Sequence, residues 1–80
     1  MTIESRLIQV FRDSLELPPD CEIPGLAYRA VPEWDSVGHM RLVAALETEF
    51  DLMLETEQII DLSSFSKALE ILAAHGVQTV

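Results

Sequence analysis

The sequence predicts an all-α fold, a small four-helix bundle of three main helices and one short helix. Three observations predict it: apolar residues recur at helical spacing in three long segments, no segment alternates like a strand, and the prolines gather in one stretch. With 80 residues, 49% of them apolar, the chain suits a single packed domain over residues 1–80 rather than a disordered segment. A long loop is predicted between the first two main helices.

The first main helix is expected over residues 2–17. Thr2 is the expected N-cap, and Pro18 and Pro19 are expected to end the helix. Apolar residues fall on one helical face, at Ile3, Leu7, Val10, Phe11 and Leu15. This face is predicted to enter the core.

Residues 18–33 show no clean periodicity and contain every proline of the chain. They predict a long ordered loop that bridges the first two main helices, because four apolar residues can anchor it: Ile23, Leu26, Tyr28 and Val31.

The second main helix is expected over residues 36–50. Its core face is formed by Leu42, Val43, Leu46 and Phe50, with His39 at the N-terminal end of that face. A second apolar arc carries Val37, Met40 and Ala44. We expect this arc to pack inward too; the alternative is an apolar rim beside Ser36 that contacts a partner.

Two further helices complete the bundle. A short one over residues 56–61 is expected to be capped by Thr56, with Ile59 and Ile60 facing inward. The last follows residues 63–64 and ends before Gly76. Its predicted inner face consists of Phe65, Ala68, Leu69 and Leu72.

Charge excludes some classes of partner. Five Lys and Arg against 14 Asp and Glu give a net charge of −9, which argues against nucleic acid and anionic membranes and favours partners with basic patches. In residues 33–61 Arg41 is the only Lys or Arg, while the acids are Glu33, Asp35, Glu47, Glu49, Asp51, Glu55, Glu57 and Asp61. The segment is thus either a solvated acidic surface or a docking face, and we favour docking.

The single cysteine and the hydropathy pattern bear on location. Cys21 cannot form an intramolecular disulfide and is expected to be partly buried. No signal segment or membrane-length apolar run is found, so we expect no membrane insertion and a cytoplasmic location.

Ser36, at the start of the second main helix, is open to three interpretations: helix cap, nucleophile or attachment site. His39 lies one turn away but on the core face, where a half-buried packing role is expected, and no glycine-flanked elbow surrounds Ser36. The candidate metal ligands show no recurrent spacing; they are Cys21, His39, Asp61 and His75. We therefore expect a non-catalytic protein.

The run Asp35-Ser36-Val37, followed by Leu-Val-Ala-Ala-Leu-Glu-Thr-Glu-Phe over residues 42–50, resembles the second helix of acyl carrier proteins. The order of predicted helices extends the resemblance over nearly the whole chain. It implies that Ser36 receives 4′-phosphopantetheine from coenzyme A through a separate Mg²⁺-dependent phosphopantetheinyl transferase, which recognises Asp35. The thiol of this arm would hold acyl or aminoacyl cargo as a thioester and present it to ligases, synthases or transferases.

The resemblance also implies partner-binding residues on the second main helix. These are Val37, Met40, Ala44 and Glu47, with weaker claims for Glu33, Asp51 and Glu57. Fatty-acid carriers are commonly acidic soon after the serine, where this chain has Gly38-His39-Met40-Arg41. Arg41 would repel a basic patch, and together with Trp34 before the motif it indicates a stand-alone carrier for a specialised pathway. We also expect the protein to be a monomer.

Trp34, another departure from those carriers, is expected to pack the loop onto the bundle; the alternative is contact with a partner. Two alternatives to a carrier stay open. One is an unmodified acidic helical adapter in which Ser36 only caps a helix, and the other is a small serine hydrolase.

Overall fold

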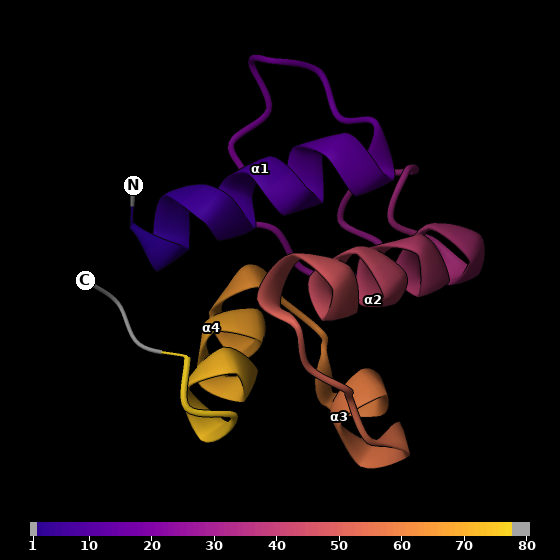
Figure 1. Cartoon of the computed structure of the whole chain (residues 1–80). Helices are drawn as coiled ribbons and strands as arrows, with labels where there is room; N and C mark the ends of the chain where they lie inside the picture. The colour runs from indigo at the N-terminus through magenta and orange to yellow at the C-terminus, as the bar shows by residue number, and fades with distance from the viewer. Residues whose placement is uncertain (1, 78–80) are drawn as a thin grey trace.

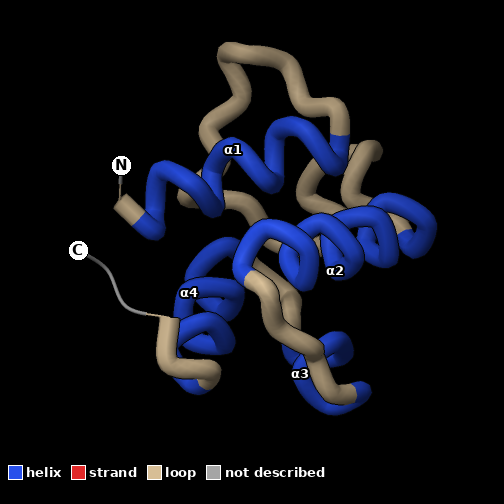
Figure 2. Tube along the Cα trace, in the orientation of Figure 1, coloured by secondary structure: helices blue, strands red, loops and turns tan. Residues whose placement is uncertain are grey.

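The computed structural model describes residues 2–77. Within them the chain forms four helices and no strand, as Figures 1 and 2 show. The helices are α1 (Ile3–Leu15), α2 (Ser36–Phe50), α3 (Thr56–Asp61) and α4 (Phe65–Ala74). They form a compact unit with a radius of gyration of 11.4 Å. The all-helical prediction is confirmed for these residues.

Helices α1 and α2 pack against each other, and α3 and α4 lie below this pair in the view of Figure 1. An aromatic cluster stands at the centre of the core. Phe11 meets Trp34 edge to face and Phe65 at a tilt, with ring centroids 5.3 Å apart in both pairs. Because these rings come from α1, the loop and α4, one cluster joins three parts of the chain.

Helix α1 begins as predicted, since the Thr2 hydroxyl accepts a hydrogen bond from the Ser5 N–H at 3.0 Å. It ends at Leu15, two residues earlier than predicted. Glu16 adopts the left-handed conformation, with φ 55°, and both its N–H and that of Leu17 donate to the Arg12 carbonyl. The left-handed residue, not the pair of prolines, thus ends the helix.

Residues 16–35 contain no helix, and backbone hydrogen bonds tie them to the start of α4. The Tyr28 N–H donates to the Ser63 carbonyl at 2.8 Å, and the Phe65 N–H donates to the Leu26 carbonyl at 3.0 Å. The anchors predicted in this segment are buried (Ile23, Leu26) or half-buried (Tyr28, Val31). These contacts hold Tyr28 near the N-terminus of α2.

Helix α2 has the predicted bounds, and Leu42, Val43 and Leu46 are buried as predicted, with Phe50 half-buried. The expectation that the second arc packs inward was wrong: Val37 is 67% exposed and Met40 55% exposed, and Ala44 is exposed too. The side of α2 that carries Leu42 and Leu46 meets α1 and the core, and no described residue covers the other arc.

Helix α3 also has the predicted bounds, but its N-cap is Glu55 rather than Thr56. The Gln58 side-chain oxygen accepts from the Glu55 N–H at 3.1 Å and secures that first turn. Ile59 is half-buried, whereas the inward prediction for Ile60 was wrong, since its side chain is 73% exposed. Adjacent residues of a helix point about 100° apart, and of these two only Ile59 faces the core.

In α4, Phe65, Ala68 and Leu72 are buried as predicted and Leu69 is half-buried. Ile71 is also buried, which the predicted inner face did not include. The Ser64 hydroxyl caps the helix by accepting from the Lys67 N–H at 3.0 Å. Gly76 has a φ of +83°, in keeping with the predicted C-terminal signal. No helix within residues 2–77 has the length and apolarity needed to cross a membrane.

Candidate functional site

The N-terminus of α2 is organised by Asp35, not by Ser36. The Asp35 carboxylate accepts from the Gly38 N–H at 2.8 Å, and the Asp35 carbonyl accepts from the His39 N–H at 2.7 Å. The Gly38 N–H holds the pKa of the Asp35 carboxyl below its ordinary value of 3.8, against an opposing effect of desolvation. Capping by Ser36, which the sequence left open, is therefore wrong for this structure.

Ser36 is the first residue of α2, and its side chain is exposed. Its hydroxyl lies 3.5 Å from the Tyr28 hydroxyl. Because Asp35 supplies the cap, the Ser36 oxygen has no structural task at the helix end.

Gly38 is buried where the loop crosses the first turn of α2. A Cβ added there would collide with the carbonyl oxygen of Glu33 and lie 3.0 Å from the Leu15 side chain. Glycine thus allows the backbone just before Ser36 to lie against α2. The glycine at this position therefore has a packing cause.

Trp34 and His39 form a polar pair beside this turn. Trp34 is completely buried, which confirms its predicted packing role, and its indole N–H donates to Nδ1 of His39 at 3.0 Å. His39 Nε2 lies 2.8 Å from the Ile59 carbonyl oxygen of α3. Since Nδ1 is an acceptor, Nε2 carries the hydrogen and donates it. His39 is half-buried, as predicted, and both of its ring nitrogens are engaged away from Ser36.

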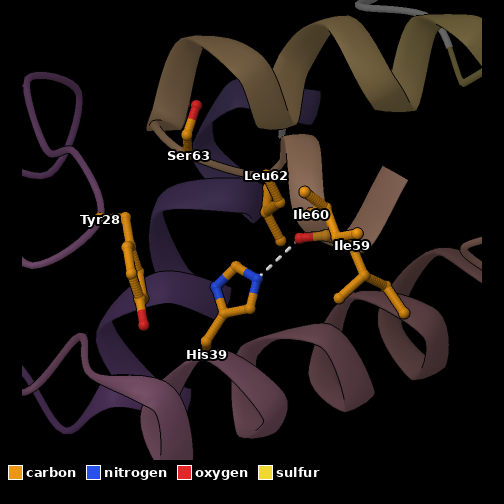
Figure 3. Close-up of a pocket in the computed structure, with 6 residues that line it drawn as sticks. All are labelled: Tyr28, His39, Ile59, Ile60, Leu62 and Ser63. Atoms are coloured by element: carbon orange, nitrogen blue, oxygen red, sulfur yellow. Dashed lines mark hydrogen bonds between the residues drawn. The ribbon is translucent and has the colours of Figure 1, made fainter. Parts of the chain in front are cut away.

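A small pocket opens between α2 and α3, with a volume of about 240 Å³. Figure 3 shows the Tyr28 ring on one side of it, the His39 imidazole at its base and α3 on the other side. Its lining residues are Tyr28, His39, Ile59, Ile60, Leu62 and Ser63. Tyr28 both lines this mostly apolar pocket and, through its hydroxyl, contacts Ser36, which does not itself line the pocket.

The predicted partner-binding residues differ in their surroundings. Val37, Met40 and Ala44 form an exposed apolar arc that begins next to Ser36. Glu47 is half-buried, and its carboxylate accepts from the Leu54 N–H at 2.9 Å. One oxygen of Glu47 therefore holds the α2–α3 connection, so a substitution of Glu47 disturbs the fold as well as the surface.

Other charges near α2 lie at the surface. Among the weaker candidates, Asp51 and Glu57 are exposed and Glu33 is half-buried. Arg41 forms an exposed ion pair with Glu16, with 3.2 Å between the guanidinium nitrogen and the carboxylate oxygen. The Glu16 carboxylate offsets part of the positive charge by which Arg41 was predicted to repel a basic patch.

The candidate metal ligands are not brought together. No group of three or more His, Cys, Asp or Glu side chains suited to a metal ion occurs in residues 2–77. Cys21 is partly buried as predicted, and His75 lies 2.8 Å from the Gln58 side-chain oxygen.

Tyr28 is the residue that the sequence did not single out for the site. Its loop has no periodicity, and the only signal was its place among the apolar anchors. No family model matches the chain, and no solved structure matches it either.

Proposed function

We propose that this protein is a stand-alone acyl carrier protein that is modified on Ser36 with 4′-phosphopantetheine. One observation carries the proposal. Ser36 is exposed at the first position of α2, and Asp35 performs the capping that would otherwise occupy its hydroxyl. The four-helix bundle arrangement, the single domain, the monomeric state and the cytoplasmic location belong to the same proposal.

The residues around Ser36 suit a phosphodiester. The N-terminus of α2 carries the positive end of the helix dipole, and the neutral Tyr28 hydroxyl is a nearby donor. Val37 is largely exposed, so space for an attached arm remains on the solvent side. When bound, the arm would supply the thiol that holds acyl or aminoacyl cargo as a thioester.

The modification needs an external enzyme. The Ser36 Oγ–P bond forms while the P–O bond between the two phosphates of coenzyme A breaks, and adenosine bisphosphate leaves. The Ser36 proton must go to a base of the Mg²⁺-dependent transferase, because both ring nitrogens of His39 are bonded to other groups. We assign Asp35, next to the serine, to transferase recognition.

The surface that follows Ser36 suits docking to ligases, synthases or transferases with basic patches. The exposed arc of Val37, Met40 and Ala44 would provide apolar contact, with a contribution from Glu47. The chain's acidic charge would steer a basic partner towards it. Arg41, which is exposed at the flank of this surface, supports a role in a specialised pathway.

Intact mass tests the proposal. The purified protein is incubated with coenzyme A, Mg²⁺ and a promiscuous phosphopantetheinyl transferase. We expect a mass increment of one phosphopantetheine, which Ser36→Ala abolishes. Ser66→Ala, which removes an exposed serine from the first turn of α4, should be modified like the wild type. No increment, or one that survives Ser36→Ala, would refute the proposal.

An unmodified adapter is the second candidate, and the exposed apolar side chains of Val37, Met40 and Ile60 favour it. It predicts no increment in the same experiment. The serine hydrolase alternative predicts that an activated fluorophosphonate labels Ser36. We expect no labelling, because His39 offers Ser36 no free lone pair.

A further inference from the structure

Tyr28 is held rigidly beside Ser36 although it belongs to the loop. Its backbone N–H is bonded to the Ser63 carbonyl at 2.8 Å. Its ring stands edge-on to His39, with centroids 5.3 Å apart at 70°, and edge-on to Trp34, at 6.1 Å and 86°. Contacts with three parts of the fold therefore set the direction of the phenol before anything binds.

The hydroxyl at the end of this ring lies at an exposed position beside Ser36. Within residues 2–77 its hydrogen-bond partner is Ser36 Oγ, at 3.5 Å. Hydroxyl–hydroxyl hydrogen bonds are usually roughly 2.5–3.0 Å long, so this contact is loose. The fold thus places the phenol hydroxyl beside Ser36 and leaves it able to bond a better acceptor there.

We propose that Tyr28 is a binding residue for the phosphodiester attached to Ser36, and this rests on the proposed function. The phenol O–H donates to a non-bridging phosphate oxygen, which is separated from Ser36 Oγ by the phosphorus atom and accepts more strongly than a serine hydroxyl. Tyr28 thereby orients the first atoms of the arm at the mouth of the pocket that its own ring lines.

A charged residue offers the main alternative. Arg29 is exposed and lines a surface hollow with Asp35, next to the modified serine. A guanidinium would attract the phosphate over a longer range, and salt would screen that attraction. A bond from the neutral phenol would depend little on salt. Salt dependence therefore separates the two.

The test compares unmodified and modified protein. Tyr28→Phe removes only the hydroxyl and keeps the ring contacts, and excess transferase with an intact-mass check yields fully modified samples. Urea unfolding is then followed by the fluorescence of Trp34, the only tryptophan. We expect Tyr28→Phe to raise the unfolding constant about two- to tenfold more in the modified protein than in the unmodified protein. The ³¹P chemical shift of the phosphodiester should also differ between wild type and variant.

The control is Ser63→Ala, which removes a hydroxyl from the same pocket and should act equally on both forms. Equal effects of Tyr28→Phe on both forms would overturn the assignment. The assignment would also be overturned if Arg29→Gln, and not Tyr28→Phe, acted differently on the modified and unmodified proteins and salt reduced that difference. Failure of the proposed function is seen separately, as wild-type protein that gains no mass.

Discussion

The indole N–H of Trp34 donates to Nδ1 of His39 across 3.0 Å, and the two rings are nearly parallel, with 16° between their planes. Through Nε2, His39 continues this link to the Ile59 carbonyl of α3. One chain of hydrogen bonds thus joins the loop, the first turn of α2 and α3. It fixes the backbone on both sides of Ser36 and the wall of the neighbouring pocket.

Loss of this link should destabilise the fold. His39→Leu leaves the buried Trp34 N–H and the Ile59 carbonyl without their partner, so we expect a loss of about 1–3 kcal/mol in the free energy of unfolding. Urea denaturation at neutral pH measures it. His75→Leu is the matched control, because the His75 imidazole is exposed and its hydrogen bond within residues 2–77 is with the Gln58 side chain. Equal losses in both variants would contradict the assigned role of His39.

Gly38→Ala should be destabilising although alanine is the better helix former. The collision with the Glu33 carbonyl forces the backbone apart, and we expect a net loss of about 1–3 kcal/mol. Gly25→Ala is the control, since an added Cβ meets nothing within 4 Å there. Thermal unfolding of both variants is the measurement. A Gly38→Ala protein as stable as the wild type would show that the fold does not require the Glu33 backbone to lie so close to α2.

The Asp35 cap should make stability depend on pH. The pKa of this carboxyl is lowered in the folded protein, chiefly by the Gly38 N–H, so folding favours the ionised form. Its contribution is therefore fully present above the unfolded pKa and is lost as pH falls through the folded pKa. In a series of thermal melts, the difference in Tm between wild type and Asp35→Ala should shrink as the pH falls through the folded pKa of Asp35. A difference that stays constant over this pH range argues against the ionised cap.

Two serines at helix starts should respond differently to alanine. Ser64 accepts from the Lys67 N–H as the cap of α4, so Ser64→Ala should cost about 1 kcal/mol in the free energy of unfolding. Ser36→Ala should change that free energy by less than about 0.5 kcal/mol, because Asp35 caps α2. Urea unfolding of the two variants checks this. If Ser36→Ala lowered the free energy of unfolding as much as Ser64→Ala, Ser36 would have a structural role in the helix.

Arg41 should hinder basic partners. Its ion pair with Glu16 is exposed, so Arg41→Glu should change the free energy of unfolding by less than about 1 kcal/mol. Loading by a transferase with a basic docking patch should become faster at low salt and lose that gain at high salt. Lys67→Glu makes the same charge change on α4 and should have a smaller effect on the initial loading rate. Equal effects of the two variants would indicate steering by net charge alone.

Local signals predicted the helices well. The bounds of α2 and α3 agree with the sequence because helical periodicity is a local signal, although the capping residues differ from those expected. The end of α1 was missed because Glu16, not a glycine, takes the left-handed conformation there. The inward predictions for Ile60 and for the Val37–Met40 side of α2 failed because apolar character does not say which neighbour is present.

The sequence by itself determined an all-α chain, the start of α2 at Ser36 and the burial of Trp34. Only the tertiary structure decided that Asp35 rather than Ser36 is the cap, that His39 bonds Trp34 and Ile59, and that Tyr28 lies at Ser36. Helical periodicity reports one face over a few turns. The contacts of Tyr28 and His39 instead depend on how a loop without periodicity folds back on α2, α3 and α4, which packing of the whole core settles.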